Sequence, residues 1–187
     1  EEQIKAMRKD GAEFIIVYPH WGIEYQMTEA SWQREIAQKL CDMGVDAIIG
    51  GHPHVIEPVD VFTSEDGTHK TFCAFSLGNQ LSNQRREMMR LKTGNTEDGL
   101  FIDLEITRNK KGDVSLTGVK YIPTWVYKNA SGPTYSIVPV DDPSTVEEKT
   151  GIKGIQAQAQ DAAFLAGYLE AFGEFKEFVD YLSAEKK

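Results

Sequence analysis

Two histidines stand one residue apart in the segment Gly51-His52-Pro53-His54, directly after a run of apolar residues. Glycines at this point let the backbone turn tightly, so the H-x-H pair can direct both imidazole rings toward one centre. Neutral imidazole is a good ligand for zinc, manganese or iron. The pattern therefore predicts a divalent-metal site, and spacing alone leaves open the alternative that both histidines are ordinary loop residues.

A third histidine, His20, lies in a polar, aromatic-rich loop that follows another apolar run. In the same loop, Glu24 can act as a general acid or base or as a metal ligand. Trp21 and Tyr25 can form an apolar wall for a substrate. Each of these three residues has a plain alternative, because it can equally pack against the protein or face solvent.

Asn79 and His69 are the remaining polar residues of chemical interest. Asn79 follows a glycine in a predicted turn, where its carboxamide can bind metal or orient a substrate oxygen, or can belong to an ordinary turn. His69 lies beside a predicted hairpin turn and is expected to be solvent-exposed and inert. The sequence has no nucleophile elbow, phosphate-binding glycine loop, dinucleotide fingerprint or C-x-x-C pair. Any chemistry is therefore expected to depend on histidine.

Three elements are predicted around these loops. Residues 13–18 and residues 45–49 are continuous apolar runs of the kind found in strands that are buried on both faces. Between them, a helix is predicted to begin at Thr28 or Ser31 and to end at Gly44. The predicted core face of this helix consists of Trp32, Ile36, Leu40 and Met43.

A strand, a helix and a second strand in this order form a βαβ unit, which implies two parallel strands. The loops that follow parallel strands leave from the same edge of the sheet, and ligands bind at that edge. His20 is therefore expected to lie beside His52 and His54, although 32 positions separate His20 from His52.

The rest of the chain is predicted to be mostly antiparallel. Hairpins are predicted over residues 59–76 and 100–119, and extended chain continues to Val140. Residues 80–98, with their cluster of arginines, have no clear apolar period and are expected to form a solvated surface segment. Residues 155–182 favour one or two helices that pack on the sheet.

A single α/β domain is expected over residues 1–187, with a motif-bearing α/β half over 1–80 and hairpins and C-terminal helices over 81–187. Residues 2–10 favour a further helix, with no cap before it, so the chain is expected to start within a domain.

The composition excludes several classes of function. A formal charge of −9 disfavours nucleic acid and anionic membranes as partners. The chain has no apolar run of about 18 residues, so no membrane contact is expected from it. Its two cysteines, Cys41 and Cys73, are expected to be buried thiols, although a single bridge stays open.

Three segments resemble, in order and spacing, the successive signatures of the CapA family of bacterial capsule and poly-γ-glutamate synthesis proteins. They are Tyr18–Tyr25, Gly50–Val55 and Phe75–Asn79. The family is similar in fold to calcineurin-like metallophosphoesterases, so the resemblance implies part of a layered α/β/β/α sandwich with mixed sheets. It also implies that His52 and His54 match the Gly-His-x-His motif of that superfamily, and that His20 matches its lone upstream metal-binding histidine.

The resemblance covers residues 13–80 and implies the C-terminal part of a CapA-like domain. The Asp-containing motifs of the superfamily precede these segments and have no counterpart in residues 1–19. The chain is therefore expected to lack about half of a binuclear site. The full-length protein is expected to be extracytoplasmic, at the bacterial cell surface, with a membrane anchor upstream of residue 1.

The function implied by the resemblance is metal-dependent hydrolysis or transfer on a surface polymer or a phosphoester. His20, His52 and His54 would hold Mn, Zn or Fe, while Glu24 or Asn79 positions the substrate. Other membrane proteins of capsule synthesis are further expected partners. Two alternatives stay open: a non-catalytic surface protein that binds or organises capsule polymer during export, and a cytoplasmic phosphodiesterase.

Overall fold

The computed structural model describes residues 1–89, 95–129, 132, 134–140, 142 and 146–151. A four-stranded sheet carries the predicted βαβ unit. Its spatial order is β1 (Ile16–Val17), β2 (Ala47–Ile49), β4 (Lys70–Ala74) and β3 (Val59–Thr63). The β1–β2 and β2–β4 pairs are parallel, and β3 and β4 form the predicted antiparallel hairpin. The α/β class and the parallel pairing are thus confirmed.

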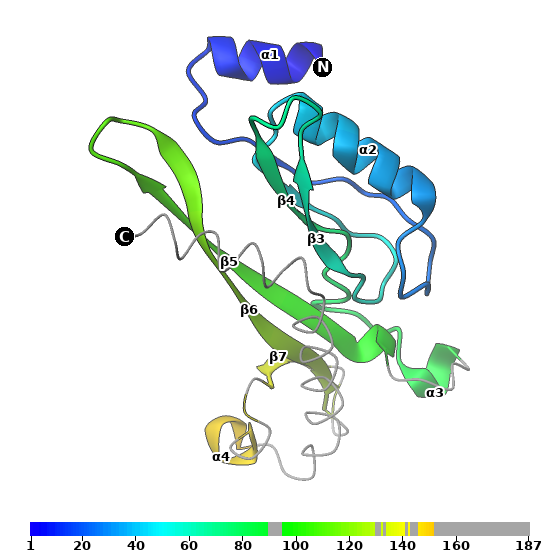
Figure 1. Cartoon of the computed structure of the whole chain (residues 1–187). Coiled ribbons are helices and arrows are strands. Elements are labelled where there is room, and N and C mark those ends of the chain that lie inside the picture. The colour runs from blue at the N-terminus through cyan, green and yellow to red at the C-terminus, as the bar shows by residue number, and fades with distance from the viewer. Residues whose placement is uncertain (90–94, 130–131, 133, 141, 143–145, 152–187) are drawn as a thin grey trace.

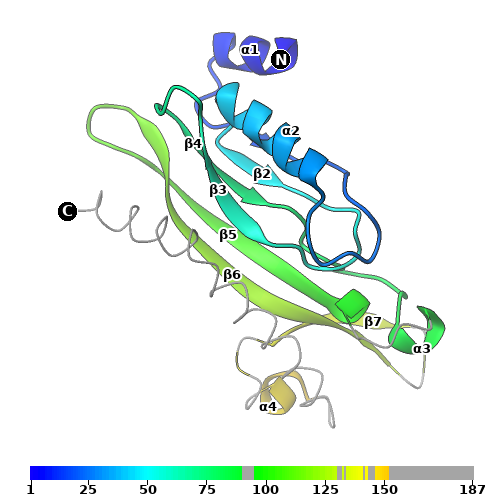
Figure 2. The same cartoon turned by 45° about the vertical axis from the view of Figure 1, so that its right-hand side comes forward.

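Helix α2 (Ser31–Asp42) covers one face of this sheet, and α1 (Glu2–Lys9) lies near the start of β1 (Figures 1 and 2). The predicted core face of α2 is wrong for Trp32 and Ile36, whereas Leu40 and Met43 are partly buried against the core as predicted. Trp32 and Ile36 are each 39% exposed, whereas Ala37 and Cys41 are fully buried. The helix packs closely through these small side chains, so its larger residues lie at the flanks.

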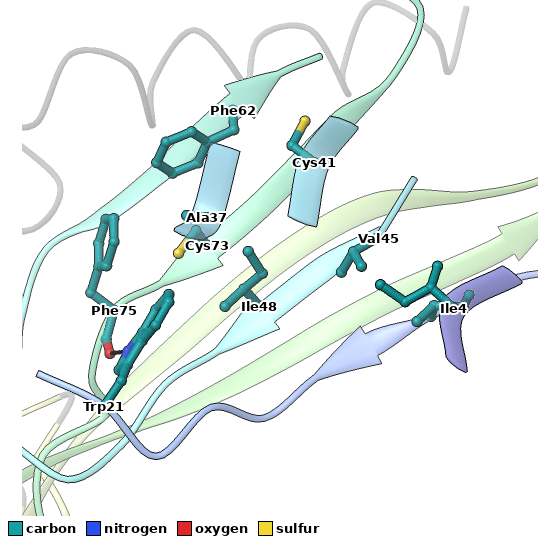
Figure 3. Close-up of a cluster of buried hydrophobic side chains, with 10 residues drawn as sticks. Ile4, Trp21, Ala37, Cys41, Val45, Ile48, Phe62, Cys73 and Phe75 are labelled. Carbon is teal, nitrogen blue, oxygen red and sulfur yellow. Dashed lines mark hydrogen bonds between the residues drawn. The ribbon is translucent and has the colours of Figure 1, made fainter. Parts of the chain in front are cut away.

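The apolar core beneath α2 gathers ten buried residues, drawn in Figure 3. Ile48 of β2 and Cys73 of β4 face this side of the sheet, while their neighbours Ile49 and Phe72 face the other side. Side chains of a strand alternate between its faces, so strands with two buried faces must be apolar throughout. This requirement explains the continuous apolar runs in the sequence.

A second sheet packs against the opposite face of the first, which makes three layers in the order helix, sheet, sheet (Figures 1 and 2). It is antiparallel, with strand order β5 (Asp98–Arg108), β6 (Val114–Lys128) and β7 (Tyr135–Pro139). The strands β5 and β6 are longer than the predicted hairpin. An isolated bridge between Gly78 and Gly99 joins the two sheets.

The segment between the sheets contains α3 (Arg86–Met89) and the short helix η1 (Asn95–Glu97). The expectation of a solvated surface segment is wrong for its second part, because Thr96, Glu97 and Asp98 are buried. Arg85 is also largely covered, and it pairs with Glu97 at 2.9 Å. This buried pair anchors the segment against the second sheet.

Helix α4 (Val146–Thr150) follows β7. The helices predicted over residues 155–182 lie outside the described residues. Within the described ranges, no helix has the length and apolar character needed to cross a membrane. Cys41 and Cys73 are both buried free thiols, as expected.

Candidate functional site

The parallel pairing of β1 and β2 continues past the ends of both strands. An isolated parallel bridge joins His20 to Gly51, and the backbone N–H of Trp21 donates to the Gly51 carbonyl at 3.0 Å. Both loops therefore leave the sheet at its carboxyl edge, where ligand sites of such sheets form. The structure brings His20 beside the His52–His54 pair, as the βαβ topology requires.

His20 and His54 both lie next to His52. The ring centroids of His20 and His52 are 4.5 Å apart, and those of His52 and His54 are 6.1 Å apart. Glu24 closes the group from the first loop, with its Oε1 3.8 Å from Nε2 of His54. One ligand atom from each of Glu24, His52 and His54 lies within 4.8 Å of the other two. The closest set of ligand atoms thus includes Glu24, with His20 adjacent to it.

The backbone of both loops is strained where these side chains converge. Positive φ angles occur at Tyr25 (66°), His52 (112°) and His54 (62°), a region that residues with a side chain rarely adopt. Such a conformation costs about 1–3 kcal/mol for each residue and persists only where the surroundings enforce it. Strain of this kind is typical of functional loops, because it aims side chains that a relaxed turn would direct elsewhere.

Gly50 allows the second loop to lie close to the neighbouring strand. A Cβ atom at this position would stand 1.9 Å from the carbonyl oxygen of Phe75 and 2.5 Å from Nε1 of Trp21. Only glycine fits such an approach. The first glycine of the Gly-Gly-His-Pro-His segment therefore serves packing, and it sets the direction in which the loop leaves β2.

Asn79 lies beneath His54 and is buried. Its side-chain oxygen is 2.9 Å from Nδ1 of His54. Its side-chain nitrogen donates to the carbonyl of Thr96 at 2.9 Å. Asn79 was predicted to face the substrate, but little of its surface is exposed because its hydrogen-bond partners enclose the amide.

The two aromatic residues of the first loop have different environments. Trp21 is 6% exposed, stacks on Phe75, and donates from Nε1 to the Phe75 carbonyl at 2.8 Å (Figure 3). Trp21 is part of the core, so its ring does not offer the exposed apolar surface that was predicted to contact substrate. Tyr25 is half-buried, and its ring stacks near His54 with centroids 6.1 Å apart. Tyr25 therefore keeps a place at the site.

His69 lies at the other end of the sheet, at the start of β4. Its Nε2 is 2.8 Å from the carbonyl oxygen of Val45, and its side chain is 27% exposed. The expected solvent exposure is only partial. It takes no part in the histidine group, and its role is a hydrogen bond to the backbone.

A buried acid behind the second loop was missed. Glu57 is 1% exposed, accepts one hydrogen bond from Nε2 of Gln33 at 3.0 Å, and leaves its Oε1 without a partner among the described residues. Burial raises the pKa of Glu57 to about 7. The available signal was a lone acidic residue in the otherwise apolar stretch between Val55 and Val59.

Gln33 connects this acid to the first loop. Its side-chain oxygen accepts from the backbone N–H of Ala30 at the start of α2, which satisfies a donor that the helix leaves open. A Cβ on Gly22 would lie 3.0 Å from its amide nitrogen. A fully buried glutamine therefore fixes the position of the loop that carries His20 and Glu24.

Two imidazoles and a carboxylate are a donor set that suits zinc, manganese or iron. The group lies at a surface edge, since Glu24 is exposed and His52 and His54 are half-buried. Such a site leaves room for water or a substrate oxygen. The arrangement fits metal-assisted hydrolysis or transfer, and the identity of the ligands stays a prediction.

Comparison with known proteins finds relatives for the part of the chain that contains both site loops. The family model described as "Bacterial capsule synthesis protein PGA_cap" matches residues 1–84. The chain is 31% identical over 111 residues to the "PGA biosynthesis protein CapA" of Bacillus subtilis (strain 168), an alignment that covers 59% of this chain and 26% of the relative. It is 34% identical over 80 residues to the "Capsule biosynthesis protein CapA" of Bacillus anthracis. This alignment covers 43% of this chain and 18% of the relative.

The chain thus matches about a quarter or less of the length of these curated relatives. The matched segment contains His20, His52 and His54 of the candidate site together with Glu24 and Asn79. Residues 1–84 of this chain are therefore similar to the bacterial capsule synthesis proteins of the PGA_cap type.

Proposed function

We propose that this chain carries a metal centre that serves hydrolysis or transfer on a surface polymer or a phosphoester in capsule or poly-γ-glutamate biosynthesis. The observation that carries the proposal is the approach of ligand atoms from Glu24, His52 and His54 to within 4.8 Å of one another. The names of the two relatives supply the biosynthetic context, and a place at the cell surface is expected because capsules form there.

The donor set supports Mn, Zn or Fe as the metal, with His52 and His54 as nitrogen ligands. When bound, a divalent ion at this edge would lower the pKa of its water and polarise an oxygen of the substrate. Glu24, with half of its side chain exposed, can complete the ligand set or accept a proton from the attacking group. These two roles differ in whether the carboxylate is needed for metal affinity.

His20 and Tyr25 are placed to meet the substrate. His20 is exposed and lies against His52, so it can bind the ion together with that ring or donate a hydrogen bond to a substrate oxygen. The ring of Tyr25 lies beside that of His54, with centroids 6.1 Å apart, so it can limit the approach of water from that direction. Substrate is therefore expected to enter from the side of His20.

The charge of the chain makes substrate binding depend on the metal. A formal charge of −9 repels a polyanion such as poly-γ-glutamate. A divalent ion between the two loops would supply local positive charge. We expect an acidic polymer to bind only in the presence of metal, and a neutral substrate to be less sensitive.

Metal binding is the experiment that tests this function. Zinc and manganese would be titrated into the purified chain, and into any longer natural form of the protein, with elemental analysis of the product. One ion or more for each chain is expected, and His52→Ala or His54→Ala should abolish its retention. His69→Ala is the matched control, because this histidine lies at the other end of the sheet and should leave binding unchanged.

Failure to bind either ion at saturating concentration in all forms would overturn the metal-centre proposal. Polymer binding that persists without metal would then favour a non-catalytic protein that organises capsule polymer. If metal binds, Glu24→Gln separates the two roles of the carboxylate. Weaker binding assigns it as a ligand, and unchanged binding with lost turnover assigns it to proton transfer.

A further inference from the structure

The side chain of Asn79 contacts His54 at two points, the imidazole ring and the backbone carbonyl. Its Oδ1 is 2.9 Å from Nδ1 of the imidazole, and its Nδ2 is 3.3 Å from the carbonyl oxygen of the same histidine. The amide nitrogen also contacts the carbonyl of Thr96 at 2.9 Å and Oε1 of Gln84 at 3.3 Å. One buried amide thus contacts both the ring and the backbone of His54.

These contacts decide which end of the amide faces the ring. The carbonyl oxygens of His54 and Thr96 can only accept hydrogen bonds, so the NH₂ group must face them. The carbonyl oxygen of the Asn79 amide must then face Nδ1 of the imidazole. Since that oxygen cannot donate, Nδ1 has to carry the proton for a hydrogen bond to form at 2.9 Å.

The other ring nitrogen is left free to act as a ligand. A neutral imidazole with a proton on Nδ1 has an unprotonated Nε2 with its lone pair directed outward. Nε2 of His54 is 3.8 Å from Oε1 of Glu24, which is longer than a hydrogen bond. Nε2 is therefore a ligand atom without a proton that lies near the Glu24 carboxylate, within the group formed by Glu24, His52 and His54.

We infer that Asn79 is a positioning residue that fixes His54 in the Nδ1–H tautomer and thereby presents Nε2 to the proposed metal centre. The tautomer follows from the hydrogen bonds alone, and only the presentation to metal rests on the proposed function. Partners of this kind orient metal-binding histidines and raise their basicity, and their loss weakens metal affinity by about 10–100-fold.

The anchor of Asn79 comes from outside the segment that matches the family model. Thr96 precedes Glu97, whose carboxylate accepts from Nη2 of Arg85 at 2.9 Å and from Nε1 of Trp125 at 3.1 Å. The backbone N–H of Asn79 donates to the carbonyl of Asp98 at 3.0 Å. The second sheet therefore helps to orient a histidine that the first sheet carries.

Nitrogen-15 NMR of the histidine rings tests the tautomer directly. The spectrum would be recorded on the metal-free chain at alkaline pH, where imidazoles are neutral, with His54→Ala used to assign the signals. A protonated Nδ1 and an unprotonated Nε2 are expected for His54. The reverse pattern in the unmodified chain would overturn the inference.

Substitution of Asn79 then tests its role. Asn79→Ala removes the acceptor, so His54 should shift toward the Nε2–H tautomer that free histidine favours. Asn79→Asp keeps an acceptor at Nδ1 and should preserve the original tautomer. Gln84→Ala is the control, because this residue contacts the amide but not the ring. A His54 spectrum that is the same in Asn79→Ala as in the unmodified chain would overturn the inference.

Metal titration separates this inference from the proposed function. Zinc affinity should fall by about 10–100-fold in Asn79→Ala and much less in Gln84→Ala. Unchanged zinc affinity in Asn79→Ala would overturn the presentation of Nε2 to metal. If the unmodified chain binds no metal, the proposed function fails, while the NMR result still decides the tautomer.

Discussion

The two sheets contribute to the histidine group in different ways. The first sheet carries every candidate ligand on the loops that follow β1 and β2, and its residues match the family model. The second sheet carries no candidate ligand among its described residues, and the short helix η1 that leads into it supplies buried polar contacts through Thr96 and Glu97. The comparison teaches that short parallel strands bring reactive side chains together, while a separate layer holds one of them in a defined orientation.

The largest expected effect on stability comes from a substitution where the first sheet is most closely packed, at Gly50. Gly50→Ala would place a Cβ atom 1.9 Å from the Phe75 carbonyl, so β2 and β4 would have to separate or the loop would have to move. We expect a loss of about 4 kcal/mol or more in the free energy of unfolding, or failure to fold. Chemical denaturation measures the effect.

Gly51→Ala is the matched control for that substitution. The neighbouring glycine has no atom within 4 Å of a Cβ added to it, so this variant should remain close to the unmodified chain in stability. Equal destabilisation by both changes would contradict the steric explanation and would point instead to a general need for flexibility in the loop.

The next largest effect is expected from removing the buried polar contacts that join η1 to the second sheet. Glu97→Ala would leave the Arg85 guanidinium without its buried partner and Trp125 Nε1 without its acceptor. Removal of one partner of such a pair costs about 3–5 kcal/mol. Glu87→Ala is the control, since Glu87 also pairs with Arg85 but is mostly exposed, and such a pair contributes about 0–1 kcal/mol. Similar losses in the two variants would mean that burial does not matter here.

The smallest of the three effects is a pH dependence of the free energy of unfolding, which tests the role of Glu57, the buried acid beneath the site. Below pH 4.5, Glu57 is protonated in both the folded and unfolded chain. Between pH 4.5 and about 7, the unfolded chain releases this proton and the folded chain keeps it, so stability falls as pH rises. The difference between the two pKa values corresponds to a loss of up to about 3 kcal/mol.

Glu57→Gln should remove that part of the pH dependence, which denaturation curves recorded from pH 4.5 to pH 8 would detect. The exposed residue Glu65 supplies the control, because Glu65→Gln should leave the slope unchanged. A slope that is identical in all three proteins would show that Glu57 ionises in the folded state as readily as in the unfolded state.

Much of the candidate site could be predicted from sequence because strand order decides it. Two apolar runs with a helix between them require parallel strands, and parallel strands place His20 beside His52 without any knowledge of side-chain packing. The proximity of Glu24 to His54 follows from the same pairing of loops. The H-x-H motif and the loop position of Asn79 were visible as local patterns.

Other features depend on contacts between distant segments. Trp21 lies in a polar loop, yet its backbone extends the β1–β2 pairing, which directs its ring into the core. The buried face of α2 depends on how closely the helix approaches the sheet, which periodicity does not reveal. Glu97 becomes buried only because Arg85 and Trp125 reach it from other parts of the chain. None of these contacts leaves a local sequence signal.

The left-handed backbone at His52 and His54 has a consequence for how this loop can change over time. Glycine and, to a lesser degree, asparagine adopt such angles with less strain, so replacing His52 by glycine should relieve strain in the folded chain. The same change at His54 would also remove the partner of the buried Asn79 amide oxygen. A laboratory selection for heat resistance alone would therefore favour the loss of the His52 ring, and its retention would require simultaneous selection for what the ring does.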